Sequence, residues 1–161
     1  MSPDDEGLVK VTIPLRGDAL ESGFRTETVW AEPLGDDRYM IWNVPLFAYN
    51  IEMRDVVRCR PNPDGDHPVV SAVETRGDCF GMRVYFDLSA TDADIEQIVA
   101  LFKARRAVVG QFDRTLWSFG LRWLDDYEAM GPVLEPWVDD GVLEFESILQ
   151  DDQPAYDGEE A

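Results

Sequence analysis

The segment Trp30–Val57, with the sequence WAEPLGDDRYMIWNVPLFAYNIEMRDVV, is the densest apolar and aromatic stretch of the chain. Within it, residues 34–37 have the composition of a turn, because Gly admits positive φ and Asp side chains bond to their own backbone. The turn predicts one strand over residues 24–33 and a second, covered on both faces, over residues 39–44. We expect the apolar residues 46–49 that follow to pack back across the open end of a small sheet.

Alternating apolar residues predict further strands on either side of this segment. Short stretches rich in Pro, Gly and Asp separate these strands, which cover residues 9–15, 54–60, 69–75 and 79–88. A run of short strands joined by turns is typical of a meander. We therefore predict a β-rich half over residues 8–88, folded as a small β-barrel or a bent antiparallel sheet, after a flexible start at residues 1–7.

The hydrophobic period changes from two to about 3.6 residues in the second half of the chain. Thr91 and Asp94 have the spacing of a capping box, and apolar residues then recur at helical spacing. This pattern predicts a helix over residues 92–107, followed by Gly110 as its end, with Arg105 and Arg106 in the last turn where they complement the helix dipole.

A strand over residues 115–123 comes next, then a second helix that has Asp125 as its N-cap and is kinked or split by Pro132, and then a closing strand over residues 142–149. Strands that alternate with helices indicate an open β-α-β-α-β sandwich with its two helices on one face. The predicted fold class is therefore α+β, with residues 79–149 packed on the β-rich half. Residues 150–161 are polar and acidic and are predicted to be a flexible tail.

A set of short motifs is spread over most of the chain. The motifs are Glu27–Glu32, Tyr39, Asn43–Phe47, Asp55–Val57, Leu116–Leu121 and Gly141–Phe145. Together they resemble the bacterial family catalogued as domain of unknown function family 4265 (DUF4265), over residues 8–148. The chain departs from the family pattern at Leu46, where Phe is usual, and at Pro132 and Pro136. The resemblance implies a fold and no activity.

The composition, with 161 residues and 45% hydrophobic residues, allows one good core or two small cores that share an interface. The first residues lack the pattern of a secretory signal, and the longest uncharged run, Tyr39–Ile51, is too short to span a bilayer. We therefore expect a cytoplasmic protein. Cys59 and Cys79 are expected to be buried as small hydrophobic residues rather than to form a disulfide.

The chain offers few of the side chains that catalysis requires. His67 is the single histidine and lies in a predicted turn, and together with Cys59 and Cys79 it has no recognised zinc spacing. The Asp64-Gly65-Asp66 turn lacks the later glutamate of a calcium-binding loop, and no glycine-rich phosphate loop is present. We predict no catalytic residue, no metal ion and no cofactor, and we expect the protein not to be an enzyme.

The net charge of −19 disfavours nucleic acid as a direct ligand, since phosphate binding depends on Lys and Arg. From residue 123 onward the chain has 13 acidic residues and no basic one, so the acidity is concentrated there. We predict a non-enzymatic acidic binding protein, such as an immunity-type inhibitor of a basic toxin or enzyme that acts on nucleic acid, with no membrane partner. The predicted partner-binding residues are Asp125, Asp126, Glu135, Trp137, Asp139, Asp140, Glu144 and Glu146.

Two alternatives stay open at this point. The total acidity, but not its concentration from residue 123 onward, is also explained by the base composition of the genome or by a salt-adapted host. A small-ligand receptor or an enzyme would instead use a pocket between the two halves, with Trp30, Tyr39 and Asn43 as its walls. In the absence of such a ligand, Trp30, Trp42 and Trp123 are expected to be core anchors.

Overall fold

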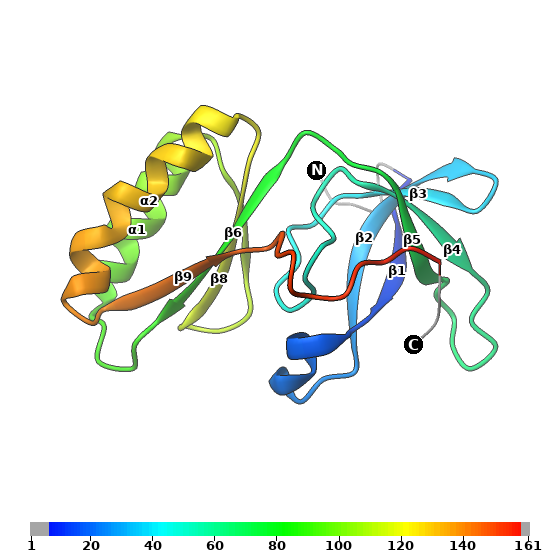
Figure 1. Cartoon of the computed structure of the whole chain (residues 1–161), viewed down its shortest axis with the longest axis horizontal. Helices are drawn as coiled ribbons and strands as arrows, with labels where there is room; N and C mark the ends of the chain where they lie inside the picture. Colours follow the sequence, from blue (N-terminus) through cyan, green and yellow to red (C-terminus); the bar gives the residue numbers. More distant parts are fainter. Residues whose placement is uncertain (1–6, 159–161) are drawn as a thin grey trace.

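The computed structural model of the protein describes residues 7–158 and consists of two halves side by side, as shown in Figure 1. In this part of the chain, a closed barrel of five strands is followed by a sheet of four strands with two α-helices. The predicted α+β class, with a small barrel before an open sandwich, is confirmed. Apart from Gly7, the predicted flexible start lies outside the described residues.

The barrel is a meander in which each strand is antiparallel to the next, and a parallel contact between its first and last strands closes it. Its strands are β1 (Val9–Pro14), β2 (Thr26–Gly35), β3 (Arg38–Ile41), β4 (Val56–Arg60) and β5 (Val69–Thr75). A 3-10 helix that the sequence did not predict, η2 (Gly17–Ser22), joins the first two strands. The predicted turn is confirmed, because Gly35, Asp36 and Asp37 all have positive φ.

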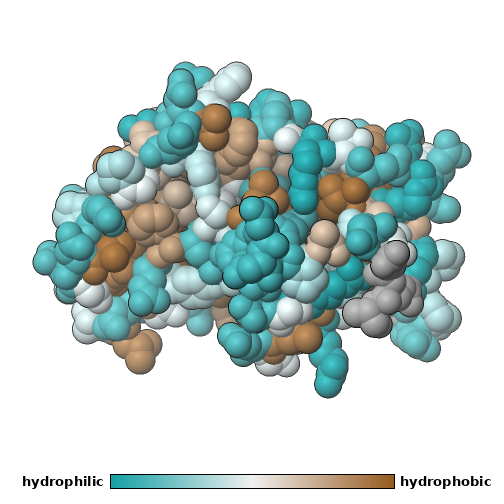
Figure 2. Space-filling model, viewed as in Figure 1, coloured by the Kyte–Doolittle hydropathy of each residue, from teal (hydrophilic) through white to brown (hydrophobic). Residues whose placement is uncertain are grey.

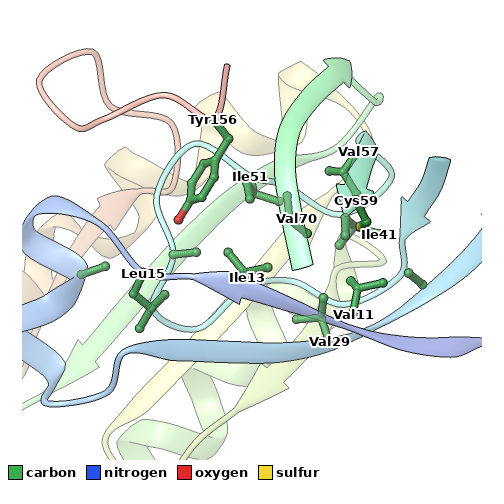
Figure 3. Close-up of a cluster of buried hydrophobic side chains, with 13 residues drawn as sticks. Val11, Ile13, Leu15, Val29, Ile41, Ile51, Val57, Cys59, Val70 and Tyr156 are labelled. Carbon is green, nitrogen blue, oxygen red and sulfur yellow. The ribbon is translucent and has the colours of Figure 1, made fainter. Parts of the chain in front are cut away.

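The barrel core is filled by alternate residues of the strands and by the loop between β3 and β4 (Figure 3). Ala48 and Ile51 of that loop are fully buried in it, in line with the expected packing of this segment across the sheet. The carboxylate of Glu27 holds the loop in place, because it accepts hydrogen bonds from the backbone N–H groups of Leu46, Phe47 and Ala48.

The second half has the order β-α-β-β-α-β, which is the ferredoxin-like arrangement. Its elements are β6 (Phe80–Phe86), α1 (Asp92–Ala104), β7 (Val108–Gln111), β8 (Leu116–Leu121), α2 (Leu124–Asp139) and β9 (Leu143–Ser147). The sheet order is β7-β8-β6-β9. The sixth predicted strand of the meander is thus not a barrel strand, since β6 pairs with β8 and β9. We call residues 80–147 the ferredoxin-like half.

Strand β7 was missed, and the first helix was predicted three residues too long. The capping box of Thr91 and Asp94 is confirmed, but α1 ends at Ala104. Arg106 has a φ of 62°, in the left-handed region, and turns the chain away from the helix axis into β7. Gly110 lies inside that strand rather than at a helix end, and its position opposite Ser118 of β8 leaves no room for a side chain.

The second helix begins two residues earlier than predicted, and it is not split. Its N-cap is Trp123, which makes no capping hydrogen bond with its side chain, so the predicted cap at Asp125 is wrong. Pro132 and Pro136 each remove a backbone donor, yet α2 is continuous from Leu124 to Asp139. Burial of residues such as Met130 and Leu134 against the sheet stabilises the helix despite both prolines.

The helices cover one face of the sheet, and the barrel lies against the other face (Figure 1). A small apolar cluster joins the two halves and consists of Val44, Met53, Cys79 and Ile148. Arg83 is fully buried beside this cluster and donates from Nη2 to the backbone carbonyl oxygens of Pro45 and Ala48. Cys59 and Cys79 are both buried and free, as expected.

The segment that follows β9 returns to the barrel, so the prediction of a flexible tail is wrong for residues 150–158. Tyr156 is only 4% exposed and belongs to the barrel core, where its hydroxyl donates to the carbonyl oxygen of Pro14 (Figure 3). Asn50 Nδ2 donates to backbone carbonyl oxygens of the returning segment, including that of Gln153. The polar composition concealed this single aromatic anchor. Residues 159–161 lie outside the described residues.

Candidate functional site

The predicted acidic partner surface is only partly assembled by the fold. Asp125, Glu135 and Asp139 lie on α2, Asp140 directly follows the helix, and all four are exposed. Asp126 is on the same helix, but its carboxylate is engaged by Arg105 Nη1 at 2.8 Å. The exposed side of α2 therefore carries part of the predicted acidic partner surface.

The remaining predicted partner residues do not extend that surface. Trp137 is half-buried and packs against the core between the helices and the sheet. Glu144 and Glu146 lie on the opposite face of the sheet, beside Tyr85 and Arg83 of β6. Glu146 is also occupied internally, because it pairs with Arg83 and accepts hydrogen bonds from the hydroxyls of Tyr49 and Tyr85.

The alternative pocket also has different walls from those predicted. Trp30 and Tyr39 do line one hollow, of about 630 Å³, but every residue around it belongs to the barrel half. Trp30 is half-buried on the outer side of the barrel, with the Lys10 ammonium 5.1 Å from its ring, so its predicted role as a core anchor is wrong. Asn43 does not line the hollow, and its Oδ1 accepts a hydrogen bond from the backbone N–H of Trp30.

A different cleft, of about 480 Å³, lies between the two halves. Among the described residues, four of the chain's twelve arginines line it together with two tryptophans and two apolar residues. We call it the arginine cleft, and its lining residues are Trp42, Met53, Arg54, Arg105, Arg106, Val108, Arg122 and Trp123. A neighbouring hollow of about 520 Å³ shares Arg105, Arg106 and Trp123 with it.

The topology explains how these residues meet. Trp42, Met53 and Arg54 belong to the loop between β3 and β4 of the barrel. Residues 105–108 follow α1 and begin β7, and residues 122–123 connect β8 to α2. Since β7 and β8 are paired, these two connections lie at the same end of the sheet, where the barrel loop reaches them.

Both tryptophans of the cleft are exposed, which overturns the prediction that they are core anchors. The exposed fraction is 36% for Trp42 and 61% for Trp123. The indole Nε1 of Trp42 donates to Glu32 Oε1 at 3.2 Å, which fixes the ring. A large aromatic surface left open to water beside a hollow is typical of a binding site rather than of a packed core.

The cleft is positively charged although the chain is strongly acidic. Asp78 pairs with Arg54 at 2.6 Å and with Arg122 at 3.1 Å, and Asp126 pairs with Arg105. Hydrogen bonds from Arg54 and Arg122 lower the pKa of Asp78, so this carboxylate stays ionised. The side chain of Arg106 makes no ion pair or hydrogen bond with the part of the chain that the structure describes. The four guanidinium groups thus exceed the two paired carboxylates by two charges.

Two of the arginines also have unusual backbone conformations. Among the described residues, five that are not glycine have positive φ, and Arg54 and Arg106 are two of them, at 75° and 62°. Such conformations are strained for residues with a Cβ atom and occur preferentially at functional sites. Arg54 makes a sharp turn in the barrel loop, and Arg106 makes one in the α1–β7 connection. Both turns lie at the border of the cleft.

The arginine cleft has no contiguous sequence motif, because its residues are far apart in the chain. In the sequence alone, the positions of Arg105 and Arg106 indicate only an interaction with the helix dipole, and Trp123 fits a core residue. One usable signal was present, namely that Arg122 adjoins Trp123 and that Arg105 adjoins Arg106 in a chain with only fourteen basic residues. Arginine beside exposed aromatic rings is a common feature of binding surfaces.

The chemistry that the cleft provides is binding rather than proton transfer. Guanidinium groups remain protonated in proteins and donate hydrogen bonds in a fixed planar array, so they do not act as general bases. Within residues 7–158, no group of three or more His, Cys, Asp and Glu residues could hold a metal ion. The helices of the same region are also not long and apolar enough for any of them to cross a membrane.

The fold and the cleft define an α+β protein in which a five-stranded barrel carries a ferredoxin-like half, as seen in the described residues. The chain belongs to the family described as Domain of unknown function (DUF4265), which matches residues 27–145 and confirms the resemblance noted in the sequence. A crystal structure of a hypothetical protein from Neisseria gonorrhoeae is similar, with a TM-score of 0.71 over 88% of this chain and 95% of that chain. The identity is 13%, so the likeness concerns the fold alone. No curated protein matches the chain.

Proposed function

We propose that this protein is a non-enzymatic binding protein that holds a small organic anion in the arginine cleft. The observation that carries the proposal is the convergence of Arg54, Arg105, Arg106 and Arg122, from both halves, on one hollow with exposed indole rings. A planar guanidinium matches the geometry of a carboxylate or phosphate group, and an indole face stacks on a flat ring. The ligand class is therefore a planar aromatic ring that bears a phosphate or a carboxylate.

The size and the charge of the protein favour a small ligand over a polymer. A hollow of about 480 Å³ is within the range that holds drug-sized molecules. A long polyanion such as nucleic acid would extend beyond the cleft, where the net charge of −19 repels it. A compact anion with one or two charges is subject mainly to the local arginines.

The test is a calorimetric titration of the whole protein with 1-naphthyl phosphate. Inorganic phosphate and 1-naphthol are titrated separately, and each is expected to bind at least about tenfold more weakly, because each lacks one half of the recognised chemistry. Arg106→Gln is expected to weaken binding of 1-naphthyl phosphate about tenfold, since a charged hydrogen bond is lost. Arg25→Gln removes the same charge at an exposed position outside the cleft and serves as the control.

Two results would contradict the proposal. Equal weakening by Arg106→Gln and Arg25→Gln would show that only the overall charge matters. Equal affinity for inorganic phosphate and 1-naphthyl phosphate would show that the tryptophan rings contribute nothing to recognition.

A second candidate function is the capture of a basic protein on the exposed acidic end of α2. Asp139 lies in the last turn and Asp140 follows it, where the helix dipole disfavours negative charge, and no basic residue balances them in that turn. We propose a basic partner, such as a cognate toxin that acts on nucleic acid, and a cytoplasmic location for the complex. Glu144 and Glu146 are left out of this surface because they lie on the other face of the sheet.

The test of this second candidate uses a partner recovered from the native host and a double variant, Asp139→Asn with Asp140→Asn. We expect a slower association rate and a weaker dependence on ionic strength, since steering charges act mainly on association. Asp64→Asn with Asp66→Asn, in an exposed turn of the barrel half, is the control with the same change in charge. An unchanged rate with no dependence on salt would exclude this surface.

A further inference from the structure

A second cleft between the halves, of about 470 Å³, has the opposite chemistry to the arginine cleft. It is bordered by η2 and the loop before β4 on the barrel side, and by β6 and the β7–β8 connection on the other side. The two clefts lie at opposite ends of the β7–β8 hairpin, since one adjoins residues 112–116 and the other adjoins residues 108 and 122. We call the second one the phenylalanine cleft.

Three phenylalanine rings from both halves meet in this cleft. Phe47 lies 5.2 Å from Phe24 and 5.0 Å from Phe112 between ring centroids, and Phe24 and Phe112 are 5.7 Å apart. Phe24 and Phe112 remain 45% and 49% exposed, so this contact does not bury them. The rings of Tyr49 and Tyr85 line the same cleft. An aromatic group of this size that stays open to water is suited to an incoming ligand.

The rim of the cleft is acidic. Asp18, Glu21 and Asp113 line it and are exposed, and no Lys or Arg is among the described residues that border it. Hydrogen bonds from the backbone N–H groups of Thr115 and Leu116 lower the pKa of Asp113, which keeps its carboxylate charged. Behind the tyrosines, Glu146 is already paired with Arg83, so the carboxylates open to a ligand are those of the rim.

We propose that the phenylalanine cleft binds an arginine side chain presented by a basic segment of a partner protein. A guanidinium group stacks on aromatic faces through the cation–π attraction, and it donates hydrogen bonds to carboxylates in its own plane. The cleft offers both kinds of group, with rings on its walls and carboxylates on its rim. The site is distinct from the arginine cleft and does not depend on the ligand proposed there.

A peptide segment fits the surroundings better than a free cation. Leu20, which is 45% exposed, lies on η2 between the rim residues Asp18 and Glu21, so apolar surface is available beside the cleft for neighbouring residues of a peptide. The net charge of −19 attracts basic proteins and speeds their approach. The aromatic walls then select the arginine that enters.

The experiment is a titration of the full chain with two short peptides of equal length, one with a central arginine and one with citrulline in its place. Amide signals of Phe112 and Asp113 are followed by NMR at physiological salt. We expect the arginine peptide to bind at least about tenfold more tightly, because citrulline lacks the charge that the rings and carboxylates recognise. Nα-acetyl-arginine amide is titrated in parallel and is expected to bind more weakly than the peptide.

The variants separate binding from folding. Phe112→Leu keeps apolar bulk but removes the ring, and it is expected to weaken the arginine peptide about fivefold while leaving the melting temperature unchanged. Glu21→Gln is expected to weaken binding about threefold, whereas Glu128→Gln on α2, an equal change in charge outside the cleft, leaves it unchanged. Equal effects of the two glutamate variants, full binding by Phe112→Leu, or equal affinity for the citrulline peptide would each overturn the proposal. Equal affinity for the free arginine derivative would overturn the peptide as the occupant.

Discussion

Arg54 of the barrel half donates from Nε to Asp78 Oδ1 at 2.6 Å. Asp78 lies on the connection between β5 and β6, and its second oxygen accepts a hydrogen bond from Arg122 of the ferredoxin-like half. One carboxylate on the connection therefore engages an arginine from each half. The anionic group of the proposed ligand would compete with this carboxylate for the same two guanidinium groups.

We predict that Asp78→Asn raises the affinity for 1-naphthyl phosphate about threefold to tenfold, because the variant removes an internal competitor for the same guanidinium groups. The free energy of unfolding is expected to change by less than about 1 kcal/mol, since the ion pairs of Asp78 are exposed to solvent. Calorimetry and urea denaturation measure the two effects. Weaker binding by the variant would indicate that Asp78 orients the arginines instead.

A second prediction concerns Trp123, whose indole is 61% exposed in the arginine cleft. Trp123→Ala is expected to lower the affinity for 1-naphthyl phosphate about tenfold through the loss of stacking, with a change in unfolding free energy of about 1 kcal/mol or less. Trp30→Ala on the outer side of the barrel is the matched control and should leave the affinity unchanged. If both variants bind equally well, the indole of Trp123 has no part in recognition.

Glu52 gives the third prediction. Burial raises the pKa of its carboxyl group from 4.5 to about 7, although the backbone N–H of Gly81 donates to it. The folded state therefore binds this proton more tightly than the unfolded state does. The resulting stabilisation is complete below pH 4.5 and is lost as the pH rises through about 7.

The difference between the two pKa values corresponds to about 3 kcal/mol. We expect Glu52→Gln to remove this share of the decline in unfolding free energy between pH 5 and pH 8, as measured by urea denaturation at each pH. Glu96→Gln, at an exposed position on α1, should decline as the parent protein does. The same decline in both variants would show that Glu52 ionises normally.

The fourth prediction concerns the segment that follows β9. Tyr156→Ala is expected to reduce the unfolding free energy by about 3 kcal/mol, because it empties part of the barrel core. Tyr156→Phe should cost only about 1 kcal/mol, since it removes the hydrogen bond to Pro14 and keeps the ring. Thermal and urea denaturation of the two variants give the comparison, and a parent-like Tyr156→Ala would mean that the segment is not anchored.

The parts of the fold that follow from local periodicity were predictable. Val11 and Ile13 alternate with polar residues and do face the barrel core, and Thr91 with Asp94 does cap α1. Alternation shows which residues share a face, but it does not name the partner of a strand. For this reason β6 was assigned to the meander although it pairs in the other sheet.

Other features lacked a local signal. Strand β7 has four residues and is defined by its pairing with β8, and the anchoring of the last segment depends on the single ring of Tyr156. The arginine cleft requires the topology itself, because it joins Arg54 to residues more than fifty positions later in the sequence. Surface hydropathy does not reveal a binding site either. The face of the molecule in Figure 2 is mostly hydrophilic, with scattered hydrophobic patches.

The return of the chain to the barrel after β9 makes the ferredoxin-like half an insertion within the barrel. The two ends of the insertion are adjacent, because the N–H of Ile148 donates to the carbonyl oxygen of Gly81. During synthesis the strands of the barrel leave the ribosome first, yet Tyr156 arrives only after the whole insertion has been made. The first half to emerge is thus the last to be completed, since the last segment of the chain supplies part of its core.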